Sequence, residues 1–256
     1  MLRSRIIPCL LVHKKGLVKT VNFKDPKYVG DPINAVKIFN EKEVDELIVL
    51  DIDATVENRS PNYELIKNLA TECRMPFCYG GGITTVEQAK KIIELGAEKL
   101  AISSSAINNP ELIKAIGIAV GVQSVVVVID VRKKNILAGG GYDIYTNNGK
   151  IKSKIKLKDF INQLNEIGVG EIVINSIDYD GCMKGYDLAL ISMIRDLTNF
   201  PITALGGAGT LDDIKNLISK FKIIGVSAGS LFVFKGKYKA VLINYPNREE
   251  KLRLFN

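Results

Sequence analysis

The chain has 256 residues, of which 46% are hydrophobic and 25% are charged, and its formal net charge is +7. This length suits one full-sized (βα)₈ barrel or two smaller domains. The lysines are spread without aromatic residues between them, which favours small phosphorylated anions as ligands over nucleic acid. We find no secretion signal and no apolar run long enough to cross a membrane. The four cysteines show no CxxC spacing, so we expect reduced thiols in a cytoplasmic protein.

Eight runs rich in β-branched residues alternate with segments of helical periodicity. This alternation predicts a parallel sheet whose strands are joined by helical crossovers. The predicted strands are Arg5–Val12, Glu46–Asp51, Pro76–Tyr79, Lys99–Ser103, Val125–Asp130, Glu171–Asn175, Ile202–Leu205 and Ile223–Ser227.

Amphipathic helices are predicted over residues 32–44, 84–96 and 210–220, among others. We expect Thr84 and Thr210 to be N-caps, because each precedes an acidic first turn, and Gly96 to close its helix. The connections at 13–31 and 131–156, after the first and fifth strands, are long and are interpreted as loops.

The second half of the chain repeats the first at an offset of 125 residues. Gly206 and Gly207 then align with Gly81 and Gly82, and the run at 171–178 aligns with that at 46–53. A half-barrel of four βα units would leave an open sheet edge, so two such halves are expected to close on each other. We therefore predict a single (βα)₈ barrel over residues 1–256, with internal half-barrel duplication and a boundary near 121–124.

Small residues stand at the carboxyl ends of four predicted strands. A Gly-Gly pair is more often a plain turn, but here the pattern occurs twice, each time followed by a strand that ends in small or hydroxyl residues. Such ends let an anion approach backbone N–H groups, so we predict two phosphate-binding corners on opposite sides of a barrel mouth. The predicted phosphate-binding residues are Gly82, Ser103, Ser104, Gly207, Gly229 and Ser230.

Carboxylates also lie where this architecture places its chemistry. Asp130 ends an apolar strand and is the candidate general acid or base, although it could also cap a neighbouring loop. Asp180 could equally belong to an Asp-Gly turn. The other residues expected at the mouth are Lys19, Asp51 and Asn175. With His13 as the single histidine, we predict no metal site and no cofactor.

At the opposite end of the predicted barrel, charges of alternating sign begin four strands. Arg5, Glu46, Lys99 and Glu171 could form a ring of ion pairs across the barrel bottom. The ring is either a structural plug or a gate for a small molecule that enters from that side.

Several motifs together resemble the cyclase subunit of imidazole glycerol phosphate synthase along nearly the whole chain. The motifs are RIIPCL at the start, Lys19 with 22-NF-23, 79-YGGGI-83, 107-INNPELI-113, 177-IDYDGCMKGYDL-188 and 205-LGGAGT-210. The resemblance implies a (βα)₈ barrel that docks a separate glutaminase on its N-terminal face, in a heterodimer. It also implies that ammonia passes the charged ring and reacts at the mouth with a bisphosphorylated formimino-carboxamide ribonucleotide.

Three positions depart from the pattern of that family. Asp130 matches one of its two catalytic aspartates, but the other falls on Leu11, which can neither take nor give a proton. The family's asparagine on the fourth strand is replaced by Ser103, and its threonine on the sixth by Asn175. This combination resembles the paralogous branch associated with surface-polysaccharide amidation, which includes lipopolysaccharide biosynthesis.

Three functions therefore stay open. The first is a diverged cyclase-type subunit that uses ammonia from a glutaminase. The second is a non-catalytic ammonia conduit for a sugar amidotransferase, and the third is the activity of the sister isomerase, which also needs the missing carboxylate.

Overall fold

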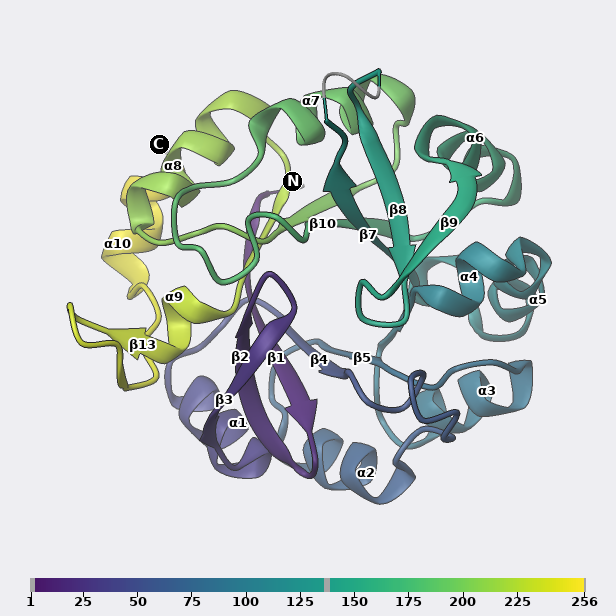
Figure 1. Cartoon of the computed structure of the whole chain (residues 1–256). Coiled ribbons are helices and arrows are strands. Elements are labelled where there is room, and N and C mark those ends of the chain that lie inside the picture. Colours follow the sequence, from purple (N-terminus) through teal and green to yellow (C-terminus); the bar gives the residue numbers. More distant parts are fainter. Residues whose placement is uncertain (1–2, 136–138, 256) are drawn as a thin grey trace.

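The computed structural model describes residues 3–135 and 139–255. Within this part, eight parallel strands pair in succession, and the last pairs again with the first to close a barrel (Figure 1). The barrel strands, in order, are β1 (Arg5–His13), β4 (Leu47–Asp51), β5 (Phe77–Gly80), β6 (Lys99–Ile102), β7 (Val125–Lys133), β10 (Glu171–Ser176), β11 (Ile202–Leu205) and β12 (Gly225–Ala228). The predicted (βα)₈ barrel is confirmed.

Helices follow the strands and form a ring outside the barrel (Figure 1). They are α1 (Pro32–Glu41), α2 (Tyr63–Glu72), α3 (Val86–Glu94), α4 (Ser104–Asn108), α5 (Pro110–Val120), η1 (Val122–Ser124), α6 (Leu157–Ile167), α7 (Leu188–Leu197), α8 (Leu211–Phe221), α9 (Ser230–Val233) and α10 (Arg248–Phe255). Among the described residues, no helix has both the length and the apolar character that crossing a bilayer requires.

The N-caps of α3 and α8 occupy matching positions of the two halves. Thr210 caps α8 in a reciprocal capping box with Asp213, as predicted. The prediction of Thr84 for α3 is wrong by one residue. Thr85 has the extended backbone that an N-cap needs and accepts a hydrogen bond from the Gln88 backbone, whereas Thr84 donates to the Gln88 side chain.

The two long connections are hairpins rather than irregular loops, which corrects the prediction for 13–31 and 131–156. The first contains β2 (Gly16–Val21) and β3 (Lys24–Gly30), and the second contains β8 (Tyr142–Thr146) and β9 (Ile151–Lys156). Part of the second, residues 136–138, lies outside the described residues. A third hairpin, β13 (Phe234–Lys235) with β14 (Ala240–Val241), follows α9.

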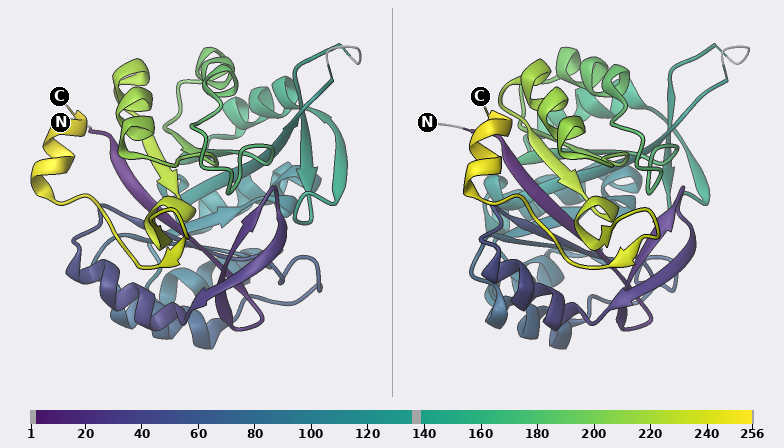
Figure 2. Two further views of the ribbon diagram at one scale, coloured as in Figure 1. Left: turned by 60° about the vertical axis from the view of Figure 1, so that its left-hand side comes forward. Right: turned by 90° about the vertical axis from the view of Figure 1, so that its left-hand side faces the viewer.

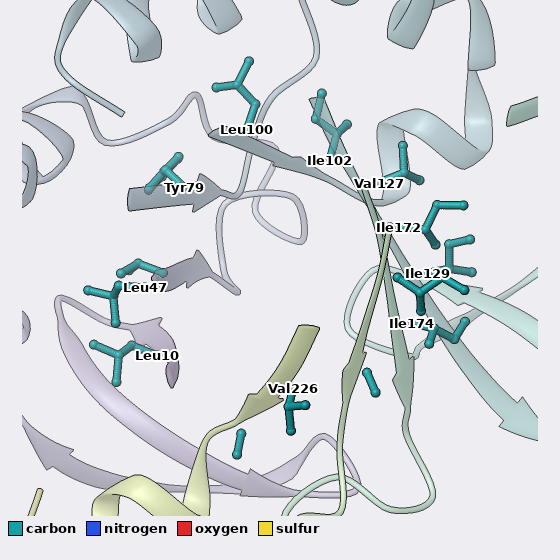
Figure 3. Packing of buried hydrophobic residues seen from close by; sticks show 14 of the residues in the cluster. Leu10, Leu47, Tyr79, Leu100, Ile102, Val127, Ile129, Ile172, Ile174 and Val226 are labelled. Atoms are coloured by element: carbon teal, nitrogen blue, oxygen red, sulfur yellow. The ribbon is translucent and has the colours of Figure 1, made fainter. Parts of the chain in front are cut away.

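Apolar side chains pack in two layers because alternate residues of each strand face opposite sides of the sheet. Val126 and Val128 of β7 point into the barrel, where they pack with Cys9, Ile48 and other interior residues. The next residues along the strands, such as Val127 and Ile129, pack between the barrel and the helices; Figure 3 shows this outer layer. Inward-facing residues at the starts of the strands therefore lie at one open end of the barrel, and those at the carboxyl ends lie at the other.

The barrel is closed by residues from opposite ends of the chain. Arg5 of β1 pairs with Gly225 of β12, and the Ser227 hydroxyl donates a hydrogen bond of 2.9 Å to the carbonyl of Ile7. Figure 2 shows the start of β1 and the C-terminal helix α10 on the same side of the molecule. The half-barrel duplication, with its boundary near 121–124, stays a prediction; residues 122–124 form the short helix η1.

Candidate functional site

A pocket opens at the carboxyl ends of the barrel strands, and we call it the mouth pocket. All of the residues predicted for phosphate binding, for catalysis and for the mouth line it. The strand order places β5 four positions from β11 in the closed ring, so the two predicted corners lie across the barrel from each other. The predicted arrangement of two corners on opposite sides of one barrel mouth is therefore present.

The glycine pairs of the corners need left-handed backbone. Gly82 has φ of +72° and Gly207 has φ of +113°. A Cβ at Gly82 would lie 2.5 Å from the carbonyl oxygen of Arg59, and a Cβ at Gly207 would lie 2.0 Å from that of Gly185. These two glycines therefore let neighbouring loops pack closely around the pocket that they line.

Each corner is completed by the first turn of a short helix. Ser104 begins α4 after Ser103, and Ser230 begins α9 after Gly229. Neither N-terminus has a side-chain cap, so the first backbone N–H groups of both turns are available to an anion.

Lys19 reaches one of the two corners from the first hairpin. This corner contains Gly207, Gly229 and Ser230, and we call it the β12 corner. It is buried, and its Nζ donates a hydrogen bond of 2.5 Å to the carbonyl of Cys9. A Cβ on Gly229 would lie only 2.4 Å from this Nζ, so the ammonium group stands directly at the corner. Burial lowers the pKa of Lys19, although nearby Asp180 works in the opposite direction.

Asp130 stands between the two corners and is held by two donors. Its Oδ1 accepts a hydrogen bond of 2.9 Å from Nδ2 of Asn175, and its Oδ2 lies 3.5 Å from the hydroxyl of Ser103. Desolvation raises the pKa of Asp130 to about 6, against these two donors and with a further contribution from Asp180. A carboxyl group in this range can take and release a proton near neutral pH.

Two other carboxylates of the mouth already have partners. Asp51 accepts from the backbone N–H groups of Asp53 and Ala54, at 3.0 and 3.1 Å, so it organises its own loop. Asp180 accepts 2.9 Å from the hydroxyl of Thr20, and burial raises its pKa. This contact joins the loop after β10 to β2, and the Asp-Gly turn that was the alternative prediction is also present, with φ of +69° at Gly181.

The four charges at the other end of the barrel form the predicted ring. Nζ of Lys99 lies 2.8 Å from Glu46 and 2.9 Å from Glu171. Arg5 pairs with the same two carboxylates, at 2.8 Å from Glu171 and closely with Glu46. The hydroxyl of Thr203 also donates to Glu171. The carboxylates are buried, and the cations are 20% to 27% exposed, so the ring closes the barrel bottom.

Comparison of the sequence with known proteins places this chain in a family. A sequence profile described as histidine biosynthesis protein matches residues 5–239. A Vibrio vulnificus protein named "Putative imidazole glycerol phosphate synthase subunit hisF3" is 56% identical over 251 residues, which is 98% of this chain and 96% of that protein. The chain belongs to the histidine biosynthesis protein family.

Two further relatives show different levels of similarity to the chain. The Pseudomonas aeruginosa protein named "Putative imidazole glycerol phosphate synthase subunit hisF2" is 53% identical, over 96% of this chain and 97% of that protein. The Natranaerobius thermophilus protein named "Imidazole glycerol phosphate synthase subunit HisF" is 38% identical, over 96% of both chains.

The mouth pocket of this family member has one apolar side. Leu11 of β1 pairs in register with Leu50 of β4, and both line the pocket. At the corresponding place in the second half, Asp130 of β7 pairs with Asn175 of β10. The second half thus places a carboxylate, that of Asp130, where the first half has leucine.

Sequence reasoning missed some residues of the pocket. Asn148 lines the mouth from the turn between β8 and β9, and Thr20 lines it from β2. The missed signal was the Asn-Asn-Gly tripeptide at 147–149, which is typical of a turn between two strands of alternating pattern.

Proposed function

We propose that this chain is the cyclase-type subunit of a glutamine-dependent complex of the imidazole glycerol phosphate synthase type. It would use ammonia supplied by a partner glutaminase and would act on a small ligand with two phosphate groups. The observation that carries this proposal is the mouth pocket itself, which brings together the residues predicted for two phosphate corners with Asp130 between them.

The roles of individual residues follow from this arrangement. Gly82, Ser103 and Ser104 would hold one phosphate, and Gly207, Gly229 and Ser230 would hold the other, with Lys19 adding positive charge at the second. These roles are the ones that the resemblance noted in the sequence analysis implies.

The proposed acid–base chemistry belongs to Asp130. Its raised pKa suits a group that takes a proton from the incoming nitrogen nucleophile and returns it to the leaving group. Asn175 orients its carboxylate. The ligand's phosphates supply binding energy far from the reacting atoms, which holds them in place for this transfer.

Ammonia would enter from the opposite end. A glutaminase docked on the N-terminal face would release ammonia at the ring of Arg5, Glu46, Lys99 and Glu171, which would act as a gate. Beyond the ring, the barrel interior is lined by apolar side chains such as Ile7 and Val173. An apolar path favours neutral ammonia over ammonium, because an unpaired charge is costly to bury.

Leu11 supports a diverged activity. With one carboxylate of the family pair absent, we propose that ordinary cyclase turnover is reduced and that the physiological acceptor belongs to a related amidation, such as that of a surface polysaccharide. The chain is 53% to 56% identical to proteins whose names call them putative subunits, against 38% for the Natranaerobius thermophilus protein named HisF, which supports a divergence from the latter.

A second candidate is a conduit that passes ammonia to a sugar amidotransferase without its own chemistry. The apolar pair of Leu11 and Leu50 favours it, since the first half of the mouth has no proton-transfer group at that place. The activity of the sister isomerase would need the missing carboxylate as well, so we rank it below both.

The deciding experiment compares two nitrogen sources. The full chain, with and without a glutaminase of the same gene neighbourhood, is assayed with the bisphosphorylated formimino-carboxamide ribonucleotide and either ammonium salt or glutamine. We expect turnover well below the usual enzyme rate of about 10 s⁻¹. A rate within tenfold of that value would contradict the claim that Leu11 weakens cyclase chemistry, and no turnover at all would favour the conduit.

The gate is tested separately with Lys99→Met. We expect this change to alter glutamine-dependent product formation and to leave ammonium-dependent formation unchanged, since free ammonium reaches the mouth from solution. An equal effect on both rates would show that the ring is a structural plug. Lys154→Ala, a change of an exposed lysine on β9, is the matched control.

A further inference from the structure

The turn between β8 and β9, residues 147–150, is the part of the second hairpin that lies at the rim of the mouth pocket. In Figure 1 it lies beside the start of α4, the helix that begins with Ser104. Asn148, at the tip, lines the pocket. The role of this turn is not explained by the two corners or by Asp130.

Hydrogen bonds tie the turn to two separate parts of the mouth. The backbone N–H of Asn147 donates a hydrogen bond of 3.1 Å to the hydroxyl oxygen of Ser104. Ser104 belongs, with Gly82 and Ser103, to the other corner, which we call the β6 corner. The side chain of Asn148 donates 2.5 Å to the carbonyl of Ile52, in the loop after β4. The turn therefore bridges two neighbouring loops across the rim.

Packing holds the same turn from its other side. A Cβ at Gly149 would lie 3.1 Å from the ring of Phe23, in the first hairpin, and 3.3 Å from Ile177, after β10. Four segments of the rim thus meet at three consecutive residues of the turn.

The backbone of the turn is unusual. Asn147, Asn148 and Gly149 have φ values of +52°, +56° and +68°, in the left-handed region that residues other than glycine seldom adopt. Asparagine tolerates this region better than most residues. Such conformations persist where surrounding contacts impose them, and they concentrate at sites that clamp a ligand.

The contact to Ser104 has a chemical consequence. A serine hydroxyl has one proton to donate and two lone pairs that accept. Because the N–H of Asn147 occupies a lone pair, the proton of Ser104 is left for an acceptor in the pocket. A phosphate oxygen that accepts it would complete a chain of hydrogen bonds, in which each bond strengthens the next.

We propose that the 147–150 turn is a ligand-positioning part of the mouth pocket, in which Asn147 orients the hydroxyl of Ser104 and Asn148 fastens the turn over the bound phosphate. Binding at the β6 corner and closure of the turn then stabilise each other. This inference rests on the proposed function for the identity of the anion, and it adds the residues that close the site around it.

The test uses Asn148→Gly, because glycine tolerates the left-handed backbone and lacks the side-chain amide that bonds to Ile52. Amide hydrogen exchange of residues 147–150 is measured by NMR on the full chain, with and without saturating inorganic phosphate. In the unchanged protein we expect phosphate to slow exchange of the Asn147 amide about tenfold, the value of one hydrogen bond of ordinary strength. Asn148→Gly should remove most of this protection and weaken phosphate binding by a similar factor.

The control is Lys154→Ala, on the adjacent strand β9, which should leave both quantities unchanged. Chemical shifts of the Gly229 and Ser230 amides report phosphate binding at the other corner. Shifts there without slower exchange in the turn would overturn the proposed coupling alone. No shift at either corner would overturn the phosphate site and, with it, the role of the turn. Equal phosphate affinity of Asn148→Gly and the unchanged protein would also refute the inference.

Discussion

The ring at the barrel bottom gives the sharpest prediction, because its four charges balance. Arg5 and Lys99 carry two positive charges, and Glu46 and Glu171 carry two negative charges, with each cation bridging both carboxylates. Lys99→Met keeps much of the side-chain volume but leaves two carboxylates against one arginine. The variant therefore buries one uncompensated negative charge.

Breaking a buried ion pair by removing one partner costs about 3–5 kcal/mol. Lys99 is 20% exposed, so water reaches part of the ring, and we expect the free energy of unfolding to fall by about 3 kcal/mol, at the lower limit. The double variant Lys99→Met/Glu46→Gln restores the charge balance. It should recover at least about 1 kcal/mol of this loss.

Urea denaturation at pH 7, followed by circular dichroism, measures both variants. The pH dependence adds a second test. Burial works against the ionised form of Glu171, but Arg5 and Lys99 outweigh it and lower its pKa. Its contribution to stability is therefore present above the unfolded pKa of about 4.3 and is lost as the pH falls through the folded value. A loss below about 1 kcal/mol for Lys99→Met, with no recovery in the double variant, would refute the buried ring.

Three further predictions concern the mouth pocket. Asp130 has a pKa raised to about 6, so the folded chain binds its proton more tightly and loses stability as pH rises from about 4 to 6. Asp130→Asn should therefore raise Tm at pH 7, and it should abolish turnover. Unchanged turnover would show that Asp130 has a structural role. Leu11→Asp should increase ammonium-dependent cyclase turnover by tenfold or more, since a second acid–base group typically contributes about 10²–10⁴; no gain in steady-state rate would contradict the reading of Leu11. Gly229→Ala should weaken phosphate binding in calorimetry by about tenfold, because its Cβ would displace Nζ of Lys19, 2.4 Å away; unchanged affinity would place the phosphate elsewhere.

The barrel could be predicted because its signals are local and repeated. Each strand is a short β-branched run, and the observed strands begin within two residues of their predicted starts, as β12 does at Gly225. The mouth residues could be predicted too, since a closed parallel barrel gathers the carboxyl ends of its strands at one rim.

The hairpins were missed because charged residues masked their alternation. Residues 151–156 read Ile-Lys-Ser-Lys-Ile-Lys, a period of two, but they lie in the connection 131–156, which was interpreted as a loop. The lysines are indeed exposed at Lys152 and Lys154, on a strand. The contact of Asn147 with Ser104 could not be predicted, because it joins residues 43 apart through a turn whose placement depends on the whole rim.

The way in which β1 is paired has a consequence for how the chain is made. Its partner on one side, β4, emerges from the ribosome early, but its partner on the other side, β12, is synthesised some 220 residues later. Until then, β1 presents unpaired N–H and C=O groups that can recruit a strand of another nascent chain. A chain that stops before Gly225 should therefore aggregate during expression rather than accumulate as a half-formed barrel.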